Sequence, residues 1–123
     1  MDSEGLKVYK WHEFDSPDNI GSGKIFMENE PVAILDAICR KERIRPKILL
    51  GYVSEKVGNK LKLSHDNPHR LGMGIKLEVL NKKKRMTLVK GLILYGVERI
   101  KLHNNWISFD TDSYLKDREL VLL

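Results

Sequence analysis

The sequence is poor in several residue types on which whole classes of protein depend. Cys39 is the only cysteine in 123 residues, which excludes an intrachain disulfide framework, a cysteine-rich zinc site and a CxxC redox pair. Aromatic residues make up 7% of the chain, and no apolar run approaches the roughly 18 residues of a membrane-spanning helix. The acidic residues 1–5 lack the apolar segment of a secretory signal. We therefore expect a cytoplasmic protein with no membrane partner.

The residues that are present are typical of a folded globular chain. Hydrophobic residues make up 41% and charged residues 32% of the sequence. The length suits one domain, and such a domain buries roughly two-thirds of the surface that its unfolded chain exposes. Turn-forming residues at 15–19 and a Gly-Ser-Gly joint at 21–23 separate the first segment from the rest. We predict a single domain over 1–123, with an N-terminal arm at 1–23 and a compact core at 24–123.

Charge is distributed unevenly along the chain. The net charge is +5, but residues 1–30 hold three lysines against seven acidic residues, and residues 104–123 hold two basic residues against four acidic ones. Residues 31–103 hold 17 basic residues against six acidic ones. A basic middle attracts polyanions such as nucleic acid. The acidic ends either fold back on this middle or face a basic partner.

One helix is predicted over residues 31–43. Asn29 suits a helix cap, and Pro31 fits the first turn, where its missing N–H is not needed. Apolar residues then recur at helical spacing through residues 34–38. Pro46 ends the helix, because the residue before a proline is disfavoured in the α conformation.

Beyond Pro46 the hydrophobic pattern alternates with the period of two that is typical of strands. This pattern predicts an α+β or mainly β chain, in which about six strands form a small antiparallel barrel or a strongly bent meander, with one helix near the N-terminus. Residues 57–59 and 81–84 are predicted as turns, and residues 113–123 fit either a short helix or a closing strand. The predicted strands are residues 47–53, 60–63, 75–79, 86–95, 99–102 and 106–109.

Two clusters of basic residues are the candidate nucleic-acid contacts. One follows the predicted helix, and the other lies at a predicted hairpin tip, where cations reach phosphates without being buried. Arginine adds a planar fork that matches a phosphate group. The first cluster comprises Arg40, Lys41, Arg43 and Arg45, followed by Lys47, and the second comprises Lys82, Lys83, Lys84 and Arg85.

Among the aromatic residues, Trp106 is the candidate for stacking on a base. Exposed rings hold single-stranded bases, and Trp106 follows a turn at the start of a predicted strand. Tyr52 and Tyr95 also fall in predicted strands, where packing in the core is the expected role. No aromatic-rich pattern typical of an RNA-binding sheet is present.

The remaining reactive side chains do not form a recognisable catalytic or metal site. His65 and His69 flank a short loop with Asp66, but Pro68 prevents the helix that would align two imidazoles four residues apart. We expect a turn there, with Asp66 and Asn67 bonding the local backbone. Cys39 lies beside the apolar stripe of the predicted helix and is expected to be a buried thiol. We predict no catalytic residues, no metal and no cofactor.

The favoured function is therefore binding without catalysis. The chain is predicted to be a small basic nucleic-acid-binding protein that contacts the phosphate backbone of DNA or RNA. The alternative is a protein-interaction module, such as a small regulator or inhibitor of a larger enzyme, whose acidic partner mimics the phosphate backbone. Small barrels also assemble through edge strands, so a homo-oligomer is a further possibility.

Overall fold

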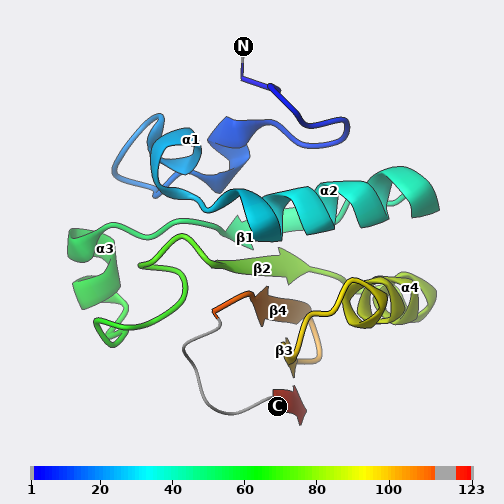
Figure 1. The fold of residues 1–123 in the computed structure, drawn as a ribbon. Coiled ribbons are helices and arrows are strands. Elements are labelled where there is room, and N and C mark those ends of the chain that lie inside the picture. Colours follow the sequence, from blue (N-terminus) through cyan, green and yellow to red (C-terminus); the bar gives the residue numbers. More distant parts are fainter. Residues whose placement is uncertain (1, 113–118, 123) are drawn as a thin grey trace.

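The structure is a computed structural model that describes residues 2–112 and 119–122 (Figure 1). Its strands form one sheet in the order β1-β2-β4-β3-β5, in which the first four are antiparallel to their neighbours and β5 runs parallel to β3. The helical elements are the 3-10 turn η1 (Trp11–Phe14), α1 (Ser22–Phe26), α2 (Asn29–Glu42), α3 (Glu55–Lys60) and α4 (Lys82–Leu94). The strands are β1 (Lys47–Leu50), β2 (Gly74–Glu78), β3 (Arg99–Leu102), β4 (Trp106–Asp110) and β5 (Glu119–Leu122).

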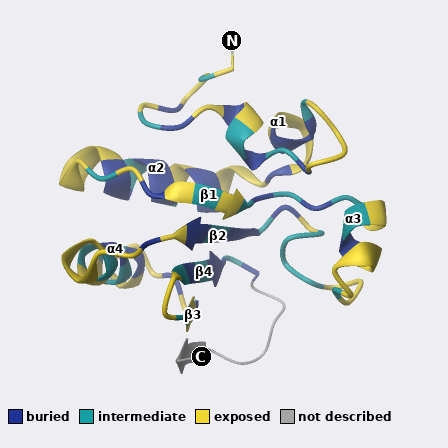
Figure 2. Cartoon of the chain, turned by 180° about the vertical axis from the view of Figure 1, so that it is seen from behind, coloured by how far each residue is buried: buried dark blue, intermediate teal, exposed yellow. Residues whose placement is uncertain are grey.

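The long helix α2 covers one face of the sheet, and α4 packs beside the C-terminal end of α2. Figure 1 shows α2 in front of β1 and α4 end-on. Figure 2 shows the same arrangement from behind, with β1 in front of α2 and with β2 mostly in the colour of buried residues. Ile75 and Leu77 of β2 lie opposite Phe109 and Ile107 of β4, so the apolar side chains share one face of the sheet. Ile100 of β3 extends this row, and all five side chains are buried.

The prediction of a barrel or strongly bent meander is wrong. The chain is α+β, but its sheet is open, and its outer strands β1 and β5 do not pair with each other in the part of the chain that the structure describes. A sheet closes into a barrel when it has no other way to cover its apolar face and its edges. Here side chains of α2 and α4 pack in the core against that face, and α4 consists of residues that were predicted as turn and strand.

The largest correction concerns residues 82–95. They were predicted as a turn followed by a strand, and residues 82–94 form α4. Leu88 and Leu92, four residues apart, are both buried, which is the spacing of one helix face. Gly91 lies within α4, and a Cβ at this position would lie 2.8 Å from Cγ2 of Ile38. The absence of a side chain lets α4 cross α2 closely.

Other predicted elements divide into confirmed and wrong ones. The predicted helix is α2, which begins two residues earlier than expected. The strands at 75–79, 99–102 and 106–109 are confirmed as β2, β3 and β4, whereas the strand at 47–53 is shortened to β1.

The turn predicted at 57–59 lies within α3, because the Ser54 side chain accepts the N–H of Val57 and caps a short helix. Residues 60–63 form no strand, and residues 113–118 and 123 lie outside the described residues.

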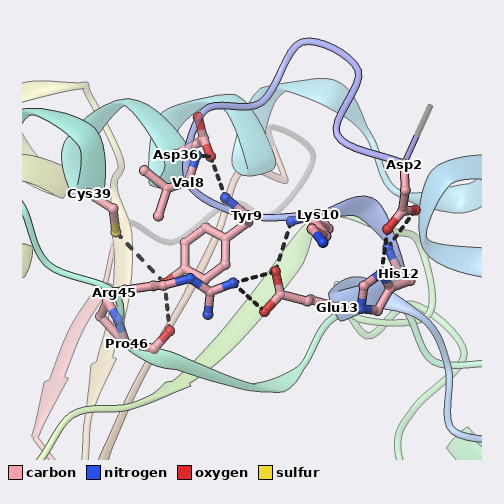
Figure 3. A network of polar contacts seen from close by, with 10 residues as sticks. All are labelled: Asp2, Val8, Tyr9, Lys10, His12, Glu13, Asp36, Cys39, Arg45 and Pro46. Carbon is pink, nitrogen blue, oxygen red and sulfur yellow. Dashed lines mark hydrogen bonds and ion pairs between the residues drawn. The ribbon is translucent and has the colours of Figure 1, made fainter.

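The N-terminal segment contributes directly to the hydrophobic core. The side chains of Tyr9, Trp11 and Phe14 are buried. The Asp36 carboxylate of α2, itself buried, accepts the backbone N–H groups of residues 7–9 at 2.7, 2.8 and 2.9 Å. Figure 3 shows this carboxylate beside Val8 and Tyr9. A carboxylate with three N–H donors satisfies groups that burial would otherwise leave unpaired, so this contact fastens the segment to α2.

Candidate functional site

The two basic clusters meet between the C-terminal end of α2 and α4. Arg45 and Lys47, which follow α2, line a hollow of about 260 Å³ together with Lys84 of α4. Asn81 and Glu78 lie at the same hollow. Lys47 and Lys84 therefore line the same hollow, although they are 37 residues apart in the sequence.

A second and wider hollow follows along the same seam. It has a volume of about 510 Å³, with Lys41 and Glu42 of α2 on one side and Lys90 of α4 on the other. Thr87 lines this hollow and lies one turn after Lys84, so the two hollows succeed one another along α4. We refer to both together as the basic groove. Its cations are Lys41, Arg45, Lys47, Lys84 and Lys90.

Most of the groove cations are available to a ligand. Lys41, Lys84 and Lys90 are exposed, and none of them forms a salt bridge to another residue within 2–112. Lys82 and Lys83 add two exposed cations to the first turn of α4, which contains no acidic residue. Cations at a helix N-terminus are disfavoured by the helix dipole, so a bound anion would relieve the repulsion there.

Arg45 is the groove cation that already has a partner. Its guanidinium donates to both carboxylate oxygens of Glu13, at 2.9 and 2.8 Å, and lies 4.9 Å from the centre of the Tyr9 ring (Figure 3). Tyr9 in turn donates its hydroxyl to the carbonyl of Pro46 at 2.5 Å, and burial raises the pKa of this phenol. One acidic residue of the N-terminal segment thus lies against the basic groove.

The other predicted contacts lie elsewhere or have another role. Arg85 was predicted at an exposed hairpin tip, but it is half-buried in α4 and donates to the carbonyls of Val79 and His103, joining the ends of β2 and β3. Arg40 is exposed beside Lys7, on the side of α2 that carries the N-terminal segment. Arg43 is exposed at the C-cap of α2, in a left-handed conformation with φ of 55°.

Trp106 lies on the outer face of the sheet, away from the core. Its ring stacks on His103 with 5.0 Å between centres and an angle of 7°, and the Lys76 ammonium lies 4.4 Å from the ring centre. Lys76 belongs to β2 and His103 follows β3, the strands on either side of β4. A base that stacked on Trp106 would have to displace one of these neighbours.

Tyr95 was predicted in the core and is instead 51% exposed, at the edge of the wider hollow. It follows the last residue of α4, four positions after Gly91, so it lies on the side of the helix that faces α2. Helical spacing from Gly91 is the signal that would have found it. Tyr52 is half-buried and stacks on Phe26 with 4.8 Å between ring centres.

The reactive side chains outside the groove have structural surroundings. Asn67 accepts the backbone N–H of His69 at 2.9 Å, as expected for a turn, and Nδ1 of His69 donates to the carbonyl of Gly51 at 3.1 Å. Burial, with the charges of Lys76 and Lys101, lowers the pKa of His69. No group of three or more metal-ligating side chains converges among the described residues.

Cys39 is buried in the core, 3.8 Å from the Tyr9 hydroxyl. Burial raises the pKa of its thiol to about 11, so the thiol is neutral at physiological pH. A neutral, buried thiol is a poor nucleophile and a poor metal ligand.

Comparisons with protein-family models, with curated proteins and with solved structures find no match to the chain. Within the described residues, no helix is long and apolar enough to cross a membrane. The function is therefore inferred from the geometry and charge of the basic groove.

Proposed function

We propose that the chain is a non-catalytic nucleic-acid-binding protein of the cytoplasm, whose basic groove contacts the phosphate backbone. The observation that carries the proposal is the convergence of Lys41, Arg45 and Lys84, which come from α2, the segment after it and α4, on one seam. Cations brought together from distant segments make a larger positive potential than the same residues spread over the surface.

The chemistry of the groove favours binding over catalysis. The acidic residues that line it are Glu42 and Glu78, and no histidine, cysteine or serine is among its lining residues. Exposed lysines are suited to phosphate contacts that release counterions, and such contacts position a nucleic acid without reading its sequence. We therefore propose backbone contact without sequence specificity, and no cofactor.

A protein partner with an acidic surface is the second candidate. The ion pair between Glu13 and Arg45 supports it, because a carboxylate already occupies one end of the groove. An acidic partner would use the same cations but would not need nucleic acid to bind.

Fluorescence anisotropy with single-stranded and duplex DNA and RNA, at about 50 and 200 mM salt, tests the proposal. We expect the slope of log affinity against log salt to become shallower in the double variant Lys84→Gln/Lys90→Gln, by about 1.8 on duplex DNA and by about 1.4 on single strands, since each lost phosphate contact removes about 0.9 or about 0.7. The matched control Lys56→Gln/Lys60→Gln removes two cations from α3, away from the groove, and should keep the original slope. Absence of binding at the lower salt, or equal losses in both variants, would refute the proposal.

A further inference from the structure

The C-terminal end of α4 exposes apolar side chains next to the basic groove. Three consecutive side chains, those of Ile93, Leu94 and Tyr95, are 56%, 81% and 51% exposed. Leu94 and Tyr95 both line the wider hollow. Exposed apolar side chains that border a hollow are typical of a binding site rather than of a solvated surface.

The wider hollow combines two kinds of surface. Ile38 and Gly91, where α4 crosses α2, line it together with Leu94 and Tyr95. Lys41 of α2 and Lys90 of α4 also line it, so each helix contributes one cation. A hollow lined by apolar side chains and by a cation from each helix suits a ligand that combines a flat apolar group with anionic groups.

A single-stranded nucleic acid offers accessible flat bases beside its anionic phosphates, and a duplex does not. Unpaired bases present their faces to a protein, whereas a duplex hides those faces and presents its phosphates. A duplex would use Lys41 and Lys90 but leave Leu94 and Tyr95 without a contact. The ring of Tyr95, unlike that of Trp106, has no aromatic or cationic neighbour recorded within residues 2–112.

We infer that the wider hollow is a subsite for single-stranded nucleic acid, in which a base stacks on Tyr95 and the adjoining phosphates contact Lys41 and Lys90. This inference rests on the proposed function and adds the form of nucleic acid that is bound. The volume of about 510 Å³ lies in the range of small-molecule pockets and accommodates a nucleobase. Stacking and phosphate contact are common to DNA and RNA, so the subsite takes both.

An anionic membrane is the other polyanion that an apolar and basic surface suits. The shape of the site favours the nucleic acid. A membrane surface binds a projecting or flat apolar face, whereas Tyr95 borders a hollow between two helices that Lys41 and Lys90 also line. The experiment therefore includes vesicles as a competing ligand.

The test measures anisotropy of a labelled 12-nucleotide single strand and of the matching duplex, each as DNA and as RNA, with the full chain. We expect Tyr95→Ala to weaken single-strand binding about five- to 100-fold, the effect of losing one stacked base, and to leave duplex binding unchanged. Tyr95→Phe retains the ring and should bind as the unmodified protein does. Phe26→Ala removes a ring of similar exposure from α1 and serves as the control.

The failure of this inference is distinguishable from the failure of the proposed function. If Tyr95→Ala leaves single-strand binding unchanged while Lys84→Gln/Lys90→Gln weakens it, the subsite is wrong and the proposed function stands. If no nucleic acid binds at about 50 mM salt, both are wrong. If Tyr95→Ala and Leu94→Ala abolish binding to phosphatidylserine vesicles and leave single-strand binding intact, the surface is a membrane contact and the subsite is wrong.

Discussion

At the scale of single residues, His69 shows how burial and nearby charges change the chemistry of a side chain. It comes from a loop whose two histidines and aspartate had the composition of a metal site, yet its ring donates a hydrogen bond to the carbonyl of Gly51. Burial and the nearby charges of Lys76 and Lys101 lower its pKa, so the folded state holds the neutral imidazole. The role of His69 is to close the turn against the backbone near β1.

This lowered pKa predicts a pH dependence of stability. The unfolded state binds a proton with the ordinary histidine pKa of about 6.5, and the folded state binds it at lower pH. Between those two values the unfolded state holds more protons, so the free energy of unfolding falls as the pH falls. We expect a lower melting temperature at pH 5.5 than at pH 7.5, measured by circular dichroism.

The matched variants assign this dependence to one ring. His69→Gln keeps a donor for the Gly51 carbonyl but does not titrate, so the difference between the two pH values should shrink. His65→Gln, an exposed neighbour in the same loop, should keep the difference. An equal dependence in all three proteins would show that another group is responsible.

Two arginines show what the sequence could not predict at this scale. Arg45 and Arg85 both belong to basic runs and were assigned the same role. Arg45 is exposed and lies at the groove, whereas Arg85 donates to backbone carbonyls at the ends of two strands. Those carbonyls come from segments that only the fold brings together, so no local pattern separates the two residues.

At the scale of elements, the crossing of α2 and α4 sets the width of the groove. Gly91 lies at the crossing, and a Cβ there would lie 2.8 to 3.1 Å from three carbons of Ile38. Ile38 is buried and β-branched, so its Cγ2 cannot move away by a change of a terminal torsion. The close approach of the two helices therefore depends on glycine.

We expect Gly91→Ala to destabilise the protein. Alanine gains about 1 kcal/mol in helix propensity, but forcing a methyl group into a packed contact costs about 1–3 kcal/mol. The net loss in the free energy of unfolding should be about 1 kcal/mol, measured by urea denaturation. In an Ile38→Ala background the clash is absent, and the same substitution should be neutral or stabilising. A loss of equal size in both backgrounds would place the cause outside this contact.

The elements that the sequence predicted correctly are those with one unambiguous period. The helical spacing before Pro46 and the alternation in β2, β3 and β4 each have a single interpretation. Residues 86–95, most of which form α4, are mainly apolar and contain β-branched residues, and both features favour a strand. The spacing of Leu88 and Leu92 was the helical signal, but it becomes decisive only when α2 is available as the packing surface. Tyr95 was wrongly predicted to lie in the core because the segment before it was predicted as a strand and forms α4 instead.

At the scale of the whole molecule, the charge segregation of the sequence becomes a contact between segments. The acidic first segment and the basic middle were apparent from composition. The composition did not show whether these two segments are in contact, because the contact depends on how the N-terminal segment packs. In the structure Glu13 pairs with Arg45 at the groove, and the hydrogen bonds to Asp36 hold that segment in place.

Glu13 therefore competes with a phosphate for Arg45. We expect Glu13→Gln to strengthen nucleic-acid binding by up to about fivefold at about 50 mM salt, since an exposed ion pair of this kind contributes about 0.2–1 kcal/mol. The gain should disappear at about 200 mM salt, where exposed charges are more strongly screened. The free energy of unfolding should fall by less than about 1 kcal/mol, because glutamine retains an oxygen that can accept the backbone N–H of Lys10.

Glu28→Gln removes the same charge at the opposite end of α2 and separates a local effect from the change in net charge. Only Glu13→Gln should strengthen binding if the released guanidinium contacts the phosphate. Equal gains in both variants would mean that net charge alone governs affinity. Weaker binding by Glu13→Gln would mean that the carboxylate orients Arg45 toward its ligand, in which case Glu13 is a positioning residue of the groove.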